Sequence, residues 1–314
     1  MDRKPVSVKS YANIAIVKYW GKADAERMIP STSSISLTLE NMYTETKLSF
    51  LPEDATGDVM YIDDELQGEK ETIKASKVLD LFRTNPNQHV KIETWNNMPT
   101  AAGLSSSSSG LSALVKAANE LFQVGKTQSE LAQIAKFASG SSSRSFFGPL
   151  AAWDKDSGDV YQVETDLKLA MIMLVLTDQK KPVSSRDGMK LCTETSTSFP
   201  DWIKQSEQDY KDMLGYLKAN DFQAVGELTE ANALRMHQTT STANPPFSYL
   251  TDASYQAMDK VKALRASGER CYFTMDAGPN VKVLCLEEDL DRLADHFRKD
   301  YQVIVSRTKE LPDA

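Results

Sequence analysis

The chain has 314 residues, 41% of them hydrophobic and 25% charged, which is ordinary for a folded globular protein long enough for two domains. Its 36 Lys and Arg against 44 Asp and Glu give a net charge of −8. This balance argues against binding of nucleic acid through a general basic field, so a site for an anion must concentrate its cations locally. The sequence has no apolar run of about 18 residues and no signal-peptide pattern, so we expect no membrane association and a cytoplasmic location. Three scattered cysteines are too few for a disulfide framework or a zinc site.

The first part of the chain mixes strand and helix patterns. Alternation of apolar and polar residues is clearest over residues 35–39, and the uninterrupted apolar run at 170–176 predicts a fully buried central strand. We expect strands over residues 6–17, 35–39, 47–50, 88–95 and 170–176, and helices over residues 73–82, 111–122 and 129–139.

Long helical patterns dominate after residue 182. We expect helices over residues 202–219, 222–236, 249–266 and 290–297, and strands over residues 271–275, 281–286 and 301–305. The first two of these strands should form a hairpin or a strand–loop–strand unit. The change of texture predicts two α+β domains, residues 1–180 and 181–314.

A loop of small residues precedes one of the predicted helices. Residues 99–110 read PTAAGLSSSSSG and run directly into the amphipathic pattern of residues 111–122. The start of a helix offers unpaired N–H groups and the positive end of its dipole, and small side chains let a polyphosphate approach closely. Serine hydroxyls add donors for phosphate and oxygen ligands for Mg²⁺. A flexible serine linker is the alternative, but the position between a strand and a helix favours phosphate binding.

Cations gather at two further places. Lys18 and Lys22 flank Tyr19 at the end of an apolar strand, where they could clamp a multiply charged phosphate or be ordinary surface lysines. Arg144 follows Ser139 and Ser141 in a serine-rich segment, and arginine is the preferred bidentate partner of a carboxylate or phosphate. A helix end that happens to carry serines is the simpler alternative there.

Two segments of the second half complete the candidate site. Residues 180–188 bring cations and hydroxyls to the predicted domain boundary, where active-site clefts are common, although a basic linker would look similar. Asp276 ends an apolar strand and precedes Ala-Gly-Pro-Asn. It is either a base placed at a strand end or a turn aspartate that bonds its own backbone.

These motifs carry a family resemblance. The pattern Pro99-x-x-x-Gly103-Leu-x-Ser-Ser resembles the phosphate loop of the GHMP kinases. Within that superfamily the chain resembles the diphosphomevalonate decarboxylases, in order and over nearly its whole length. The segments that carry this resemblance are residues 11–22, 97–104, 139–145, 183–189 and 275–280. The sequence departs from the family at residues 105–108, which are all serine where Ala-Ser-Ser-Ala is usual.

The resemblance implies a fold and a reaction. The fold would be the two-domain α+β fold of GHMP kinases, with a ribosomal S5 domain 2-like N-terminal domain, a ferredoxin-like-type C-terminal domain and the active site in the cleft between them. The reaction would be the ATP-dependent decarboxylation of mevalonate 5-diphosphate to isopentenyl diphosphate, ADP, phosphate and carbon dioxide, a step of isoprenoid biosynthesis through the mevalonate pathway. It proceeds through phosphorylation of the 3-hydroxyl, with Mg²⁺ bound and commonly in a homodimer.

The resemblance also assigns roles to residues. Asp276 would orient or deprotonate the 3-hydroxyl, Arg144 would hold the C1 carboxylate, and Lys18 would lie near Asp276 and keep it ionised. The remaining substrate contacts would come from Tyr19, Lys22, Ser139, Ser141, Ser185 and Arg186. ATP would be bound by Gly103, Leu104, Ser105, Ser106, Ser107, Ser108 and Lys181, with Ser106 and Ser107 as ligands of Mg²⁺.

Two other functions fit the same fold. A mevalonate 3-kinase or a phosphomevalonate decarboxylase would use a related site, but Asp276 with Arg144 favours decarboxylation, and Lys22 with Arg186 favours a diphosphate. A catalytically silent nucleotide-binding protein would be expected to lose the acid or the phosphate contacts, and this chain retains them.

Overall fold

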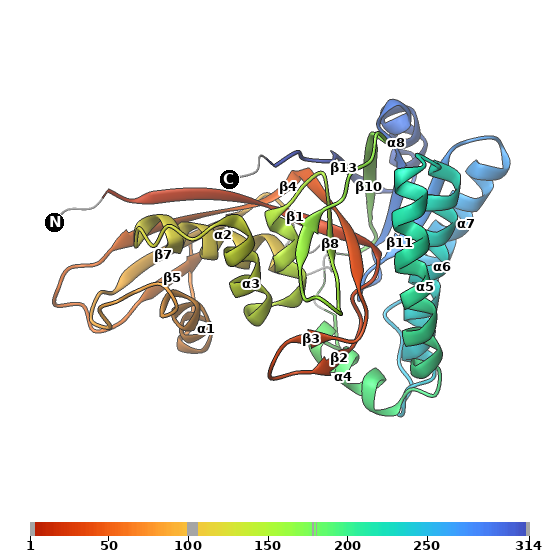
Figure 1. Ribbon diagram of the computed structural model, residues 1–314. Helices are drawn as coiled ribbons and strands as arrows, with labels where there is room; N and C mark the ends of the chain where they lie inside the picture. The colour runs from red at the N-terminus through yellow and green to blue at the C-terminus, as the bar shows by residue number, and fades with distance from the viewer. Residues whose placement is uncertain (1–3, 99–105, 178, 180, 312–314) are drawn as a thin grey trace.

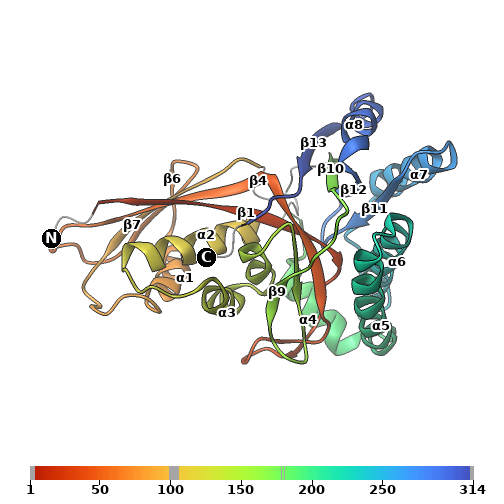
Figure 2. The same cartoon turned by 45° about the horizontal axis from the view of Figure 1, so that its top comes forward.

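The computed structural model describes residues 4–98, 106–177, 179 and 181–311. They form two lobes, each built on its own β-sheet (Figure 1). One lobe carries helices α1, α2 and α3, and the other carries α5, α6, α7 and α8 (Figures 1 and 2).

The first lobe is built on a seven-stranded sheet. Six of its strands follow the order β6-β5-β7-β4-β8-β9, and the seventh, β1, pairs with β4 in the antiparallel direction. The separate strands predicted at 35–39 and 47–50 are wrong, because both belong to the single strand β4. Exposed Glu40 and Asn41 interrupt its alternation, which hides the continuity in the sequence. The strands are β1 (Val6–Val17), β4 (Ser34–Phe50), β5 (Val59–Ile62), β6 (Glu65–Leu66), β7 (Val90–Asn96), β8 (Leu150–Trp153) and β9 (Val160–Gln162).

Three helices and a buried 3-10 turn accompany this sheet. The helices are α1 (Glu69–Leu79), α2 (Ser106–Leu121) and α3 (Gln128–Ala138). All three were expected from the sequence, but α2 begins five residues before the predicted start because the serines continue into the helix. The turn η1 (Gly140–Phe146) follows α3, and its serines and Arg144 are almost all buried.

The second sheet has the strand order β11-β12-β10-β13, with every pair antiparallel. Its strands are β10 (Leu169–Val175), β11 (Cys271–Met275), β12 (Val281–Leu286) and β13 (Gln302–Arg307). The predicted central, buried strand is confirmed as β10, and the predicted pairing of the two strands near residue 276 is confirmed as β11 with β12. Because β10 belongs to this sheet, the chain enters the second lobe before residue 180.

Helices α6 and α7 pack on β11 of the second sheet, and α5 packs beside α6 (Figures 1 and 2). A short hairpin, β2 (Lys22–Asp24) with β3 (Ile29–Pro30), lies near α4 in Figure 1. The polar α4 and this hairpin are not among the elements expected from the sequence. The helices of this part are α4 (Ser185–Thr195), α5 (Phe199–Lys218), α6 (Phe222–Ser241), α7 (Asp252–Ala266) and α8 (Leu290–Arg298), with a 3-10 turn η2 (Glu287–Asp289) before α8.

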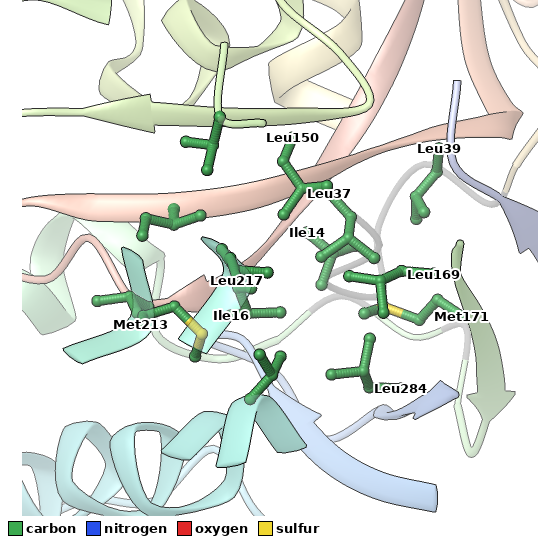
Figure 3. Close-up of a cluster of buried hydrophobic side chains, with 14 of the residues drawn as sticks. Ile14, Ile16, Leu37, Leu39, Leu150, Leu169, Met171, Met213, Leu217 and Leu284 are labelled. Carbon is green, nitrogen blue, oxygen red and sulfur yellow. The ribbon is translucent and has the colours of Figure 1, made fainter. Parts of the chain in front are cut away.

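A hydrophobic core joins the two lobes (Figure 3). Ile14 and Leu37 of the first sheet, Met171 and Leu284 of the second, and Met213 of α5 belong to one buried cluster. The ends of β1 and β11 therefore stay close together, and the residues that follow them face the same space. Within the part of the chain that the structure describes, no helix has the length and apolar character needed to cross a membrane.

Candidate active site

A cleft of about 920 Å³ brings together segments from both lobes. Residues from the end of β1, the start of α2, η1, the start of α4 and the loop after β11 line it. A second cavity of about 930 Å³, near Glu164, Lys218 and Lys309, has none of the predicted site residues in its lining. The predicted residues that line the first cleft are Lys18, Tyr19, Lys22, Ser107, Ser139, Ser141, Arg144, Lys181, Ser185, Arg186 and Asp276.

Asp276 lies between two lysines. The Nζ of Lys18 donates to Oδ1 of Asp276 at 2.8 Å and to the carbonyl of Ala15 at 2.7 Å. The Nζ of Lys282 lies 3.2 Å from Oδ2 of the same carboxylate. The side chains of Lys18 and Lys282 are 2% and 0% exposed, and that of Asp276 is 22% exposed toward the cleft. The expected proximity of Lys18 to Asp276 is thus present, and a second lysine joins it.

These charges set the protonation of the site. Burial alone would raise the pKa of the Asp276 carboxyl, but Lys18 and Lys282 outweigh it and hold that pKa well below its ordinary value. Burial, with smaller contributions from the charges of Lys282 and Arg144, lowers the pKa of Lys18 to about 8 although Asp276 opposes it. Asp276 is therefore an anion throughout the neutral range.

Arg144 is a buried cation held by hydroxyl groups. Its Nε donates to Ser36 at 3.0 Å and its Nη1 donates to Ser34 at 2.6 Å, both on β4. No carboxylate of the described residues lies within ion-pair distance of it, and the residue is only 2% exposed. Burial lowers its pKa to about 10, which still leaves it charged at neutral pH. A buried charge without a counter-ion is costly, so this guanidinium indicates that an anion binds here.

Tyr19 presents a phenol to the same space. Its hydroxyl is buried and has no hydrogen-bond partner among the described residues. Burial raises its pKa to about 12, although the charges of Arg144 and Arg186 oppose the shift, so it is a hydrogen-bond donor at neutral pH. Its ring packs directly on Gly140, where a Cβ would lie 2.8 Å from the ring. A side chain at position 140 would therefore displace the Tyr19 ring.

The segment around the start of α4 supplies further cations. Ser184 caps this helix by accepting from the backbone N of Asp187 at 3.1 Å. Lys181 donates to Oγ of Ser185 and to the carbonyl of Ala277, both at 2.6 Å, which places it beside the Asp276 loop. Lys22, at the start of β2, is close enough to Arg186 of α4 for their charges to interact. Burial, together with the charge of Arg186, lowers the pKa of Lys22.

The serine loops are placed less uniformly than expected. The hydroxyls of Ser139 and Ser141 lie 3.2 Å apart on the wall of the cleft. Ser107, on the first turn of α2, is exposed and lines the cleft. Ser108 is buried and its hydroxyl accepts from the backbone N of Asn13 at 3.4 Å, so the structure does not bring that hydroxyl to the cleft. Gly103, Leu104, Ser105 and the side chain of Ser106 lie outside the described residues.

Sequence reasoning missed two residues of the site. Lys282 and Asn13 both lie within apolar strands. A polar residue in an otherwise apolar strand is the signal in the sequence that could have found them. The Nδ2 of Asn13 donates to the carbonyl of Ser141 at 2.9 Å and to Oγ of Ser145 at 2.8 Å. Asn13 therefore joins η1 to α2 through Ser108.

The donors present suit a magnesium ion carried in with a phosphate. Among the described residues there is no group of three His, Cys, Asp or Glu side chains that could hold a metal by themselves. The Ser107 hydroxyl at the start of α2 is a hard oxygen donor open to the cleft. Mg²⁺ usually keeps several waters and binds through one or two protein groups plus phosphate oxygens, which fits this sparse set.

Comparison with known proteins identifies the family. Residues 10–163 match the diphosphomevalonate decarboxylase-like N-terminal domain, and residues 171–312 match the mevalonate 5-diphosphate decarboxylase C-terminal domain. The diphosphomevalonate decarboxylase of Saccharomyces cerevisiae is 33% identical over 91% of this chain and 79% of its own length. The chain belongs to the diphosphomevalonate decarboxylase family.

Solved structures of this family confirm the expected two-domain GHMP-kinase fold. The mevalonate pyrophosphate decarboxylase of Streptococcus pyogenes superposes with a TM-score of 0.97 and 66% identity, covering 100% of this chain and 99% of that one. A structure described as MDDEF in complex with MVAPP, AMPPCP and magnesium superposes with a TM-score of 0.90 and 40% identity, covering 98% of both chains.

Proposed function

We propose that this chain catalyses the ATP-dependent decarboxylation of mevalonate 5-diphosphate to isopentenyl diphosphate, ADP, phosphate and carbon dioxide. The observation that carries the proposal is the excess of buried positive charge around Asp276. Lys18, Lys282 and Arg144 are all at most 2% exposed, and among the described residues Asp276 is the one carboxylate that pairs with any of them. A substrate with a carboxylate and a diphosphate supplies the missing negative charge. The relative bound to MVAPP, AMPPCP and magnesium supports ATP and Mg²⁺ as the other participants.

Asp276 acts on the 3-hydroxyl as a hydrogen-bond acceptor. Because its pKa lies well below the ordinary value, it is a weak base, and its main contribution is to orient the hydroxyl toward the γ-phosphate of ATP. Phosphoryl transfer passes through a loose transition state and depends on positioning and charge stabilisation more than on early removal of a proton. A weak base that is ionised before the transfer, and that accepts the hydroxyl proton as the new O–P bond forms, meets this need.

Arg144 holds the C1 carboxylate during the second half of the reaction. The C3–O bond to the new phosphate breaks, and the electron pair of the C1–C2 bond forms the double bond as carbon dioxide leaves. Lys18 and Arg144 stabilise the negative charge that the departing phosphate acquires. Their burial strengthens this effect, because water does not screen charges inside the cleft wall.

The remaining residues bind the two anionic ends. Tyr19 donates its phenol to the substrate diphosphate, which Lys22 and Arg186 also hold, with hydroxyls from Ser139, Ser141 and Ser185. On the ATP side, Ser107 and the N–H groups at the start of α2 bind the phosphates. The hydroxyls of Ser106 and Ser107 would be the protein ligands of Mg²⁺. The metal would neutralise phosphate charge when bound. Lys181 would reach the γ-phosphate from beside Ala277.

The assembly and the compartment are part of the same proposal. We place the reaction in the cytoplasm, where the three buried free cysteines would stay reduced, and in a homodimer. Sedimentation velocity on the purified protein tests the dimer: a single species near 35 kDa would rule it out.

The test of the function is the ratio of carbon dioxide released to ADP formed, with ATP, Mg²⁺ and mevalonate 5-diphosphate supplied. We expect a ratio near one. ADP without carbon dioxide would make the protein a 3-kinase, and turnover of the monophosphate alone would make it a phosphomevalonate decarboxylase. Absence of any ADP would refute the proposal.

A further inference from the structure

Lys282 is a lysine inside the second sheet. It is on β12 directly opposite Thr274 of β11, and it is 0% exposed. Its strand neighbours Val281 and Val283 pack in the core beneath α7 and α8, whereas Leu284, on the same face as Lys282, packs in the core shared by the two lobes. An apolar residue at 282 would fit this strand without the cost of burying an ammonium group.

The ammonium of Lys282 instead meets Asp276, and the two lysines reach that carboxylate from different parts of the fold. Lys18 follows β1 of the first sheet and takes Oδ1 at 2.8 Å, so its ion pair spans the two lobes. Lys282 and Asp276 both belong to the β11–β12 unit, so the ion pair of Lys282 to Oδ2, at 3.2 Å, is local to the second sheet. With a different cation on each oxygen, the plane of the carboxylate is fixed.

We propose that Lys282 is a positioning residue of the reaction: by pairing with Oδ2 it holds the Asp276 carboxylate in the orientation that receives the substrate hydroxyl. This inference rests on the proposed function of Asp276. Lys282 acts through Asp276, since it does not line the cleft, whereas Asp276 does. Fixing a reacting group by a second layer of contacts is how sites reach the precision that catalysis needs.

Several titratable groups face Asp276, and the effect of Lys282 adds to that of the charged ones. Lys18 and Lys282 touch the carboxylate, while Arg144 of η1, Lys181 before α4 and His237 of α6 interact with it at longer range. Burial lowers the pKa of His237 to about 4, so this imidazole is neutral at physiological pH and the other four groups are cations. Loss of Lys282 would therefore raise the pKa of Asp276 while the other cations remain.

The experiment replaces Lys282 by methionine, which keeps most of the length of the side chain and removes its charge. We expect Lys282→Met to lower kcat by about tenfold or more, with the KM for mevalonate 5-diphosphate within about threefold of the parent. The acid limb of the kcat profile should also move to higher pH, because Asp276 must stay ionised. The control is Leu284→Met, on the same face of β12, which should leave kcat, KM and the pH profile at their parent values.

A readout without turnover separates this inference from the proposed function. The Asp276 carboxyl can be titrated by ¹³C NMR in labelled protein, its signal being the one lost in Asp276→Asn. A raised pKa in Lys282→Met supports the inference even if the parent protein releases no carbon dioxide, a result that would refute the proposed function alone. If parent and variant share the same kcat, pH profile and Asp276 titration, Lys282 is only structural and the inference fails. Lys282→Gln, neutral and polar, serves in the same tests should the methionine variant not fold.

Discussion

At the scale of single residues, the site is defined by a local imbalance of charge. The chain as a whole is acidic, yet Lys18, Arg144 and Lys282 are buried around the one carboxylate of Asp276. Burying an ammonium or guanidinium group costs roughly several kcal/mol unless an anion compensates its charge. The carboxylate of Asp276 cannot neutralise three cations, so the ligand-free site carries excess positive charge that the anionic substrates would neutralise.

Removing the carboxylate tests its assigned role. We expect Asp276→Asn to lower kcat about a hundredfold or more, because a neutral amide replaces the ionised carboxylate that orients the hydroxyl and accepts its proton. ATP binding, measured by calorimetry, should persist, since the residues assigned to ATP are unchanged. The free variant should also unfold at a lower temperature than the parent, because two buried lysines lose their counter-ion. Turnover at the parent rate would show that Asp276 does not act on the substrate.

The contact between Tyr19 and Gly140 makes a second prediction. In Gly140→Ala the new Cβ would lie 2.8 Å from the tyrosine ring, so the ring must move and carry its hydroxyl away from the diphosphate. We expect the KM for mevalonate 5-diphosphate to rise about tenfold, which corresponds to ~1.4 kcal/mol. The control is Gly215→Ala in α5, where a Cβ meets nothing within 4 Å and activity should be unchanged. Equal KM values in the two variants would contradict this packing argument.

At the scale of elements, the site is made where strands and helices end. The segment after β1 gives Lys18 and Tyr19, and the start of β2 gives Lys22. The end of β11 gives Asp276, and the start of α4 gives Arg186. Helix α4 is mostly polar in sequence, and its buried residues are Gly188, Met189 and Cys192. Its first turn, which carries Ser185 and Arg186, is fixed by the cap at Ser184. Its cap therefore matters for substrate binding.

The cap of α4 can be removed and compared with another cap. Ser184→Ala should destabilise α4 by about 1 kcal/mol and raise the KM for mevalonate 5-diphosphate several-fold, because the positions of Ser185 and Arg186 become less fixed. Thr251→Ala removes the cap of α7, which lies away from the cleft. It should lose a similar amount of stability in thermal unfolding and keep the parent KM. A raised KM in both variants would mean that general loosening, not α4, controls binding.

The elements also show how far the sequence could be read. Strong apolar periodicity and motif order were enough to predict β1, β10, the β11–β12 pair and most helices, together with the clustering of Lys18, Arg144 and Asp276. Helix α4 was missed because most of its residues are polar and only a few, among them Met189 and Cys192, are apolar. Two contacts depend on tertiary packing, which a local sequence pattern does not show. They are the burial of the Ser108 hydroxyl against Asn13 and the approach of Lys282 to Asp276.

At the scale of the whole molecule, the two lobes are less separate than their two sheets suggest. Leu37 and Leu150 of the first sheet pack with Leu169 and Met171 of the second in one buried cluster (Figure 3). The Lys18–Asp276 ion pair and the hydrogen bond from the backbone N of Lys18 to Asn232 of α6 also join them. A composition change near residue 180 could not reveal this, because the shared core is built from residues far apart in the sequence.

The shared core predicts that the lobes unfold together. We expect a single transition in calorimetry of the ligand-free protein, although chains with two domains often show two. Met171→Ala, in the shared cluster, should lower the free energy of unfolding by about 2–5 kcal/mol and shift that transition without splitting it. Leu79→Ala and Leu293→Ala, each in the core of one lobe, should shift the same transition. Two transitions, each moved by only one of these last variants, would show that the lobes fold independently and that the core between them is not what keeps Lys18 beside Asp276.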